Sequence, residues 1–227
     1  MTNLISQTFK DDKKKLVTFV TGGDPDLETS LKIIKTIINN GADIIEIGMP
    51  FSDPMADGPT IQLSSNRAIS KGINLEDIFY LASEAKKIKK DIPIILMGYY
   101  NLILYFGINK FVKKCKESGV DGLIIVDLQP EEDEELINEL NQNNIDLIRL
   151  ITPTTDEERL KLILGSASGF LYYVSVTGIT GQKSANLNEL EKSVAFIKKH
   201  TKLPVIPGFG IKNSTDVNNI CKISDGA

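Results

Sequence analysis

The sequence predicts one α/β domain over residues 1–227, built as a (β/α)8 barrel. Apolar runs with strand character recur about every 30 residues, the size of a βαβ unit. The runs are nearly continuous rather than alternating, as in parallel strands that are covered on both faces. The turn after the first run, residues 21–25, lacks the G-x-G-x-x-G pattern of a dinucleotide-binding doubly wound sheet, so a closed barrel is favoured.

The predicted elements alternate along the chain. Strands are expected at 16–21, 44–49, 93–98, 123–127, 147–152, 170–176 and 204–208. Asp24 is expected to cap the first long helix, with Pro25 at its first position and Gly41 as its stop. Apolar stripes at helical spacing follow this cap and fill the later gaps: Leu27, Leu31, Ile34, Ile38; Ile78, Leu81, Ala85, Ile88; Leu136, Ile137, Leu140; Leu187, Leu190, Val194, Ile197. The acidic run 131–135 is expected to form a solvated first turn, where negative charge suits the helix dipole.

The number of strands is one short of a complete barrel. Residues 41–43 and 119–122 are glycine-containing junctions that lead into the second and fourth strands, and residues 223–227 look like one more. We therefore expect a C-terminally incomplete barrel, with the eighth strand and helix missing from this chain. The first and seventh strands would then carry unpaired edges, unless the N-terminal segment around Leu4, Ile5 and Phe9 closes the gap.

Composition narrows the class of protein. The chain carries 26 Lys and Arg against 30 Asp and Glu, a net charge of −4, which argues against nucleic acid as a partner. Neither a membrane-spanning run nor the apolar core of a secretory signal is found. Cys115 and Cys221 have neither disulfide nor metal spacing, so we expect no metal site and assign both to helix packing. Cytoplasmic localisation is expected, or the stroma of a plastid.

A carboxylate-rich segment follows the second strand. Glu46 interrupts an apolar run and shares a face with Ile44 and Gly48, so it is expected to point into the barrel. A buried carboxylate needs either a cation, for which Arg149 is the chief candidate, or a chemical role. Asp57 precedes Gly58 and suits either a turn or a site.

The segment 45–58 resembles the signature of the tryptophan synthase alpha chain family: a strand glutamate, then Pro-Phe-Ser-Asp-Pro, then Asp-Gly. Segments 19–25, 175–181 and 207–211 match the family in register. The resemblance implies a (β/α)8-barrel lyase that cleaves indole-3-glycerol phosphate to indole and glyceraldehyde 3-phosphate in tryptophan biosynthesis. It also implies a beta-chain partner in an alpha2beta2 heterotetramer, with pyridoxal phosphate in that partner and no cofactor in this chain.

The resemblance also implies roles for individual residues. Glu46 would be the general acid and base, Asp57 would stabilise charge at the ring nitrogen, and Tyr172 matches an active-site tyrosine, whereas Tyr173 should pack outward. Gly181 and Gly210 would bind the phosphate through backbone N–H groups. The expected indole pocket comprises Phe19, Ile61, Ile124, Phe170, Thr180 and Phe209.

Two other functions remain open at this stage. A barrel without its eighth strand could be a weak catalyst that only binds and regulates the beta chain. Another phosphate-binding barrel enzyme, such as a sugar-phosphate isomerase or indole-glycerol-phosphate synthase, is the second alternative. The synthase family places catalytic lysines in its strands, and the seven predicted strand cores contain none. Gln129 stands where the alpha chain family often has proline near its expected beta-chain contact, and His200 is expected at a solvated helix end.

Overall fold

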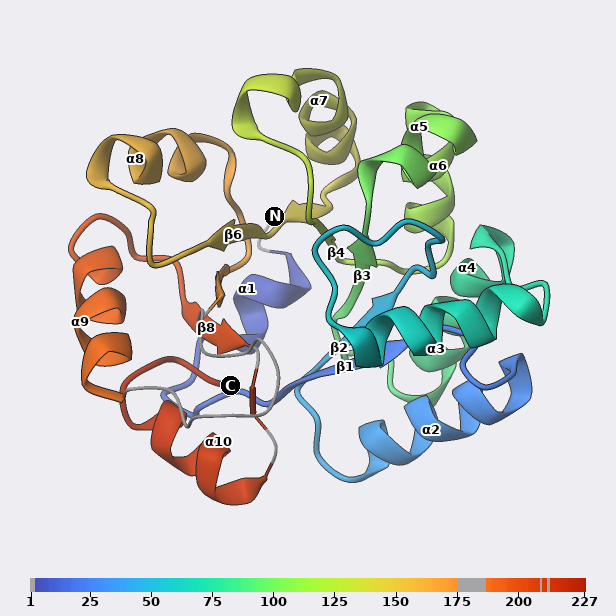
Figure 1. The fold of residues 1–227 in the computed structure, drawn as a ribbon, viewed down its shortest axis with the longest axis horizontal. Coiled ribbons are helices and arrows are strands. Elements are labelled where there is room, and N and C mark those ends of the chain that lie inside the picture. The colour runs from blue at the N-terminus through green and yellow to red at the C-terminus, as the bar shows by residue number, and fades with distance from the viewer. Residues whose placement is uncertain (1–2, 175–186, 209, 212) are drawn as a thin grey trace.

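The computed structural model describes residues 3–174, 187–208, 210–211 and 213–227. Parallel strands form a central ring, and helices surround it (Figure 1). The strands are β1 (Val17–Thr21), β2 (Ile44–Gly48), β3 (Ile94–Gly98), β4 (Gly122–Ile125), β5 (Asp146–Leu147), β6 (Arg149–Ile151), β7 (Leu171–Val174) and β8 (Val205–Gly208). β1 to β5 pair in chain order, as do β6 to β8, and all of these pairings are parallel. β5 and β6 together correspond to the predicted strand 147–152, and each of the other observed strands matches one predicted strand. The predicted barrel architecture is therefore confirmed.

The helices lie outside the ring, except for the first. They are α1 (Leu4–Thr8), α2 (Leu27–Asn39), α3 (Pro59–Ser70), α4 (Leu75–Ile88), α5 (Tyr100–Phe106), α6 (Ile108–Glu117), α7 (Glu134–Asn143), α8 (Glu157–Ser166), α9 (Leu187–Lys198) and α10 (Ser214–Cys221), with a 3-10 turn at Pro130–Glu132. The predicted cap of α2 is wrong. Asp26 caps this helix by accepting a hydrogen bond of 2.8 Å from the Thr29 N–H, whereas Asp24 accepts two hydrogen bonds from the Arg67 guanidinium. Asp26 directly precedes the first helical residue, which is where a capping side chain must lie.

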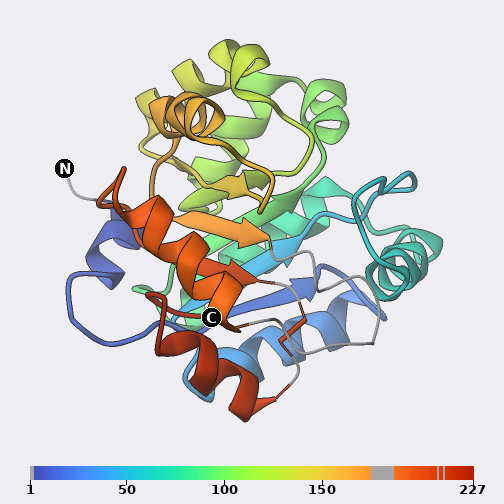
Figure 2. The ribbon, with the colours of Figure 1, turned by 60° about the vertical axis from the view of Figure 1, so that its left-hand side comes forward.

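Helix α1 closes the base of the barrel. It lies inside the ring in Figure 1 and at the amino ends of the strands in Figure 2, at the opposite end from α3. Ile5 is fully buried there, in one apolar cluster with Ile124 and Phe170. The rings of Phe9 and Phe170 lie 5.9 Å apart. Side chains of α1 and of Phe9, which directly follows it, thus fill the lower layer of the barrel interior.

The last described residues lie between β8 and β1. Lys15 and Gly226 form a parallel bridge. The Lys15 N–H donates to the Asp225 carbonyl at 3.0 Å, and the Asp225 N–H donates to Val205 at 3.1 Å. Residues 225–227 therefore occupy the position where an eighth strand would begin. The expectation that the first and seventh predicted strands are unpaired is wrong at their amino ends, because these three residues supply backbone partners.

An aspartate recurs at the amino ends of these strands. Each of these aspartates accepts a hydrogen bond of 2.8 Å from the N–H of a residue in the preceding strand segment, and each donates its own N–H back to that residue's carbonyl: Asp43 to Leu16, Asp121 to Ile94 and Asp225 to Val205. The three helix-to-strand junctions that the sequence marks as similar thus make the same pair of bonds. This similarity aligns residues 225–227 with the starts of β2 and β4.

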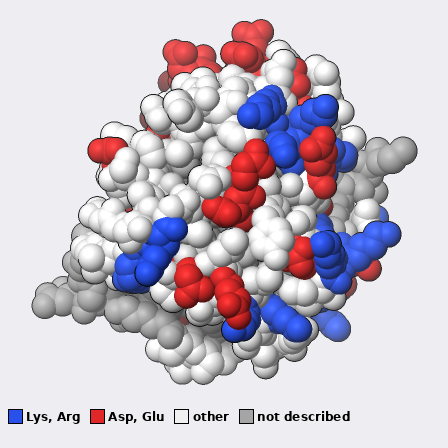
Figure 3. All heavy atoms as spheres, turned by 90° about the vertical axis from the view of Figure 1, so that its right-hand side faces the viewer, with Lys and Arg blue, Asp and Glu red and all other residues white. Residues whose placement is uncertain are grey.

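Charges of both signs mix on the outer surface. The face over α2 to α6 shows basic and acidic side chains intermingled (Figure 3). In contrast to these surface charges, Asp133 and Arg149 form a buried ion pair. Asp133 precedes α7, and Arg149 lies on β6. The prediction that the whole acidic run 131–135 is solvated is therefore wrong at Asp133. Within the described residues, no helix is long and apolar enough to cross a membrane, and no cluster of His, Cys, Asp and Glu could hold a metal ion.

Candidate active site

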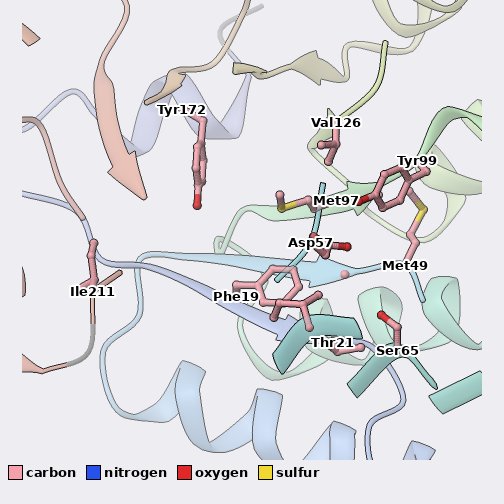
Figure 4. Close-up of a pocket in the computed structure, with 13 residues that line it drawn as sticks. Phe19, Thr21, Met49, Asp57, Ser65, Met97, Tyr99, Val126, Tyr172 and Ile211 are labelled. Carbon is pink, nitrogen blue, oxygen red and sulfur yellow. The ribbon is translucent and has the colours of Figure 1, made fainter. Parts of the chain in front are cut away.

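A cavity of about 300 Å³ opens at the carboxyl ends of the strands (Figure 4). Active sites of (β/α)8 barrels lie at this end, because the loops that follow the strands meet there. The walls come from β1 to β4, β7, α3 and the loops beside them. The lining residues are Phe19, Thr21, Gly48, Met49, Asp57, Ile61, Ser65, Met97, Gly98, Tyr99, Val126, Tyr172 and Ile211.

Glu46 lies just below this cavity, two residues before Gly48 on β2. Its side chain is 2% exposed, and its buried Oε1 atom has no hydrogen-bond partner among the described residues. Burial raises the pKa of this carboxyl from 4.5 to about 8. Arg149 does not serve as its cation, because that guanidinium donates to the Leu128 carbonyl and to Ser166 and pairs with Asp133. At neutral pH Glu46 is therefore mostly a neutral acid that can give up a proton.

Tyr172 reaches the cavity from β7, on the side opposite Asp57 (Figure 4). Burial, with a smaller contribution from negative charge on Glu46, raises the pKa of the Tyr172 phenol well above its usual value. The hydroxyl therefore keeps its proton at working pH. Tyr172 lies close enough to Glu46 for negative charge on that carboxyl to affect the pKa of the phenol.

Asp57 lies on the other side of the cavity, directly before Gly58, the N-cap of α3. Burial raises the pKa of this carboxyl, and a hydrogen bond with the Tyr99 hydroxyl opposes that rise. Tyr99 follows β3 and stacks on Phe51, with ring centroids 5.2 Å apart. The sequence analysis did not predict Tyr99 as a site residue, although its position directly after a strand places it at the active-site end of a barrel.

The other predicted residues fall into three groups. Phe19 and Ile61 lie on the cavity wall. Ile124 and Phe170 are fully buried in the barrel core beneath it. Gly210 is exposed in the turn after β8, with φ of 74°, whereas Gly181, Thr180 and Phe209 lie outside the described residues.

The remaining wall residues were not predicted. Each of Met49, Met97 and Val126 lies at or just after the carboxyl end of a strand, and Ser65 comes from α3. Tyr173 packs in the layer between barrel and helices, as predicted. Cys115 and Cys221 pack on the faces of α6 and α10. His200 is only partly exposed, 3.7 Å from Glu157, and lies away from the cavity residues.

Fold and cavity together define a (β/α)8-barrel enzyme with a buried carboxylic acid beside its site. Comparison with known proteins identifies the family. The model of the family described as tryptophan synthase alpha chain matches residues 5–227, so the chain belongs to this family. It is a carbon–carbon lyase of tryptophan biosynthesis that acts on indole-3-glycerol phosphate.

Solved structures agree with this assignment. A protein from Aquifex aeolicus VF5 is 39% identical, with a TM-score of 0.92 over 99% of this chain and 87% of its own. The tryptophan synthase subunit alpha from Legionella pneumophila str. Paris is 36% identical, with a TM-score of 0.92 over 100% of this chain and 85% of its own. Tryptophan synthase from M. tuberculosis is 26% identical, with a TM-score of 0.91 over 99% of this chain and 87% of its own.

Proposed function

We propose that Glu46, Asp57 and Tyr172 carry out the cleavage of indole-3-glycerol phosphate in this chain. The observation that supports the proposal most directly is the state of Glu46. Its carboxyl is buried beside the cavity, the described residues place no cation against it, and burial raises its pKa to about 8, so it mostly holds a proton at neutral pH. A general acid is most effective when its pKa lies near the operating pH.

Glu46 acts first as an acid and then as a base. It protonates the indole ring carbon that bears the side chain, which leaves a positive charge spread towards the ring nitrogen. The carbon–carbon bond then breaks, and its electron pair returns to the ring to give neutral indole. The hydroxyl on the departing carbon loses its proton to Glu46 as that carbon becomes the aldehyde of glyceraldehyde 3-phosphate. The proton balance closes on one carboxyl group.

Asp57 stabilises the charge that develops on the ring. Its carboxylate lies across the cavity from Tyr172 (Figure 4), so a ring between them can direct its N–H towards Asp57. A fixed anion at the atom where positive charge appears favours the transition state over the ground state. Phe19 and Ile61 supply apolar walls for the ring.

The phosphate end of the substrate requires backbone donors. Gly210 follows β8 at the rim, and its positive φ allows a turn that a residue with a side chain adopts only with strain. We assign the phosphate to Gly210 together with Gly181, and we assign Thr180 and Phe209 to the wall of the indole pocket, with Ile124 and Phe170 in the core layer beneath it.

A beta chain is the proposed partner, in an alpha2beta2 heterotetramer that works in the cytoplasm or a plastid stroma. The segments that follow β2 and β3 expose the apolar side chains Met55, Leu104 and Tyr105, of which Tyr105 is 93% exposed. Exposed apolar surface on segments at the carboxyl end of the barrel is consistent with a protein interface there. Pyridoxal phosphate belongs to that partner, and the proposed steps in this chain use only its own side chains.

The test is Glu46→Gln, which keeps the shape of the side chain but cannot transfer the proton. Indole release is measured with and without the beta chain, and Glu134→Gln on the surface of α7 is the matched control. We expect a loss of at least about 100-fold for Glu46→Gln and none for the control. A loss below about tenfold would overturn the role of Glu46 and favour a barrel that only regulates its partner.

A further inference from the structure

The carboxylate of Asp57 depends on a neighbouring strand for its place. Asp57 ends the loop between β2 and α3, and its backbone N–H donates to Pro54 within that loop at 3.1 Å. Among the described residues, the hydrogen-bonding partner of its side chain is the Tyr99 hydroxyl. Figure 4 shows this hydroxyl directed towards Asp57 from the end of β3.

Tyr99 is itself held in place by its backbone, its ring and its burial. Its backbone continues from β3 and caps α5, its ring stacks on Phe51, and its side chain is nearly fully buried. Its hydroxyl accepts a hydrogen bond of 3.0 Å from the Ala56 N–H. A phenol has one hydrogen to donate, so an oxygen that accepts from Ala56 keeps that hydrogen for Asp57. The ring thus ties two consecutive residues of the loop to the rim of β3.

We propose that Tyr99 is a positioning residue, which holds the Asp57 carboxylate where the ring nitrogen of the substrate arrives. This inference rests on the proposed role of Asp57 and goes further, because it names the group that keeps that carboxylate in place. A carboxylate on a loop without such a tether would sample several rotamers. Misplacing a catalytic group by about 1 Å can cost about 100-fold in rate.

The charged and titratable groups around Tyr99 and Asp57 set the pKa values of both, so the positioning role of Tyr99 can be tested by measuring pH dependence. Tyr172 from β7 lines the same cavity, and Glu46 lies below it on β2. Asp127, which follows β4, contributes to the raised pKa of the Tyr99 phenol. Burial, with smaller contributions from negative charge on Asp57 and Asp127, raises the pKa of Tyr99 to about 12, so it stays a donor at working pH. Its hydrogen bond opposes the effect of burial on Asp57, so its removal should raise the pKa of Asp57 further.

The experiment compares Tyr99→Phe with Tyr100→Phe, the neighbouring tyrosine, for whose hydroxyl the described residues show no hydrogen bond. The variant Tyr99→Phe retains the stacked ring, and thermal unfolding verifies that both variants fold. We expect kcat for Tyr99→Phe to fall by about 10- to 100-fold, with KM changed by less than about threefold. The limb of the pH profile on which activity is lost towards low pH should move to higher pH. Tyr100→Phe should leave both unchanged.

A double variant separates this inference from the proposal beneath it. In the Asp57→Asn background, adding Tyr99→Phe should change kcat by less than about twofold, since coupled residues are not additive. An unmoved acidic limb, or a full second loss in the double variant, would overturn the positioning role of Tyr99. If Asp57→Asn alone leaves turnover unchanged, the proposed role of Asp57 fails, and this inference fails with it.

Discussion

The hydroxyl of Tyr172 on β7 fills the space above Gly208 on β8 that a β-carbon would otherwise take. A β-carbon on Gly208 would overlap both this hydroxyl and the ring edge. The two residues lie on adjacent strands, so neither backbone can move aside without disturbing the sheet. Gly208 is therefore needed for the placement of Tyr172 at the cavity.

We predict that Gly208→Ala lowers kcat/KM by about 10-fold or more, because Tyr172 must leave its place and a site group moved by about 1 Å loses much of its effect. The matched control is Gly165→Ala on α8, where a β-carbon meets nothing within 4 Å. This control should keep full activity and gain up to about 1 kcal/mol in free energy of unfolding. Equal activity of the two variants would contradict the prediction.

The free energy of unfolding should depend on pH through Glu46. Its pKa is about 8 in the folded chain and 4.5 without burial, so unfolding between these pH values releases a proton. The stabilising contribution is complete below pH 4.5 and is lost as pH rises towards 8. At about 1.4 kcal/mol per pH unit, wild type should lose roughly 3 kcal/mol relative to Glu46→Gln between pH 4.5 and 7. Urea unfolding at several pH values measures this, and a difference that does not vary with pH would contradict it.

Catalytic activity should also depend on the protonation of Glu46, and it should fall as pH rises. The reaction begins with proton transfer from neutral Glu46, so kcat/KM should fall as pH rises through about 8. Steady-state indole release across the alkaline range gives the apparent pKa of the free enzyme. An alkaline limb that lies near pH 10, or none at all, would exclude Glu46 as the initial acid.

Arg149→Met should destabilise the fold strongly. Arg149 is buried and pairs with Asp133, and its guanidinium also donates 2.9 Å to the Leu128 carbonyl. Removing one partner of a buried ion pair costs about 3–5 kcal/mol, because the other charge is left without compensation. Adding Asp133→Asn should recover part of that loss in urea unfolding. Lys32→Met, in an exposed pair with Glu28, should cause no measurable change.

The strands were predictable because parallel strands covered on both faces leave long apolar runs in the sequence. Periodicity also gave the face on which a strand residue lies, but it could not give the depth along the barrel axis. Ile124 and Phe170 were expected on the pocket wall and lie one layer too deep. The residues two positions on, Val126 and Tyr172, line the cavity instead. The side chains that α1 places in the base determine which layer is core, and no pattern within a strand records this.

Tyr99 was missed for a related reason. Its role depends on how the loop after β2 folds over the end of β3, a contact between segments 43 residues apart. Arg149 was considered as the cation for Glu46, yet it pairs with Asp133 on the outer side of the sheet. Alternation along a strand places residues 149 and 151 on one face and 150 on the other, but the choice between the faces depends on the neighbouring strands.

Helix α1 and Phe9, which follows it, fill the base of the barrel. Among the described residues, Ile5 and Phe9 pack with Phe170 between the amino ends of the strands, at the end opposite the cavity. The cavity opens at the other rim, beside Tyr99 and Ile211, and this is the route that the described structure offers to substrate, indole and aldehyde. A protein bound to that rim would therefore control both the entry of substrate and the release of products. It could retain indole while the phosphorylated product leaves.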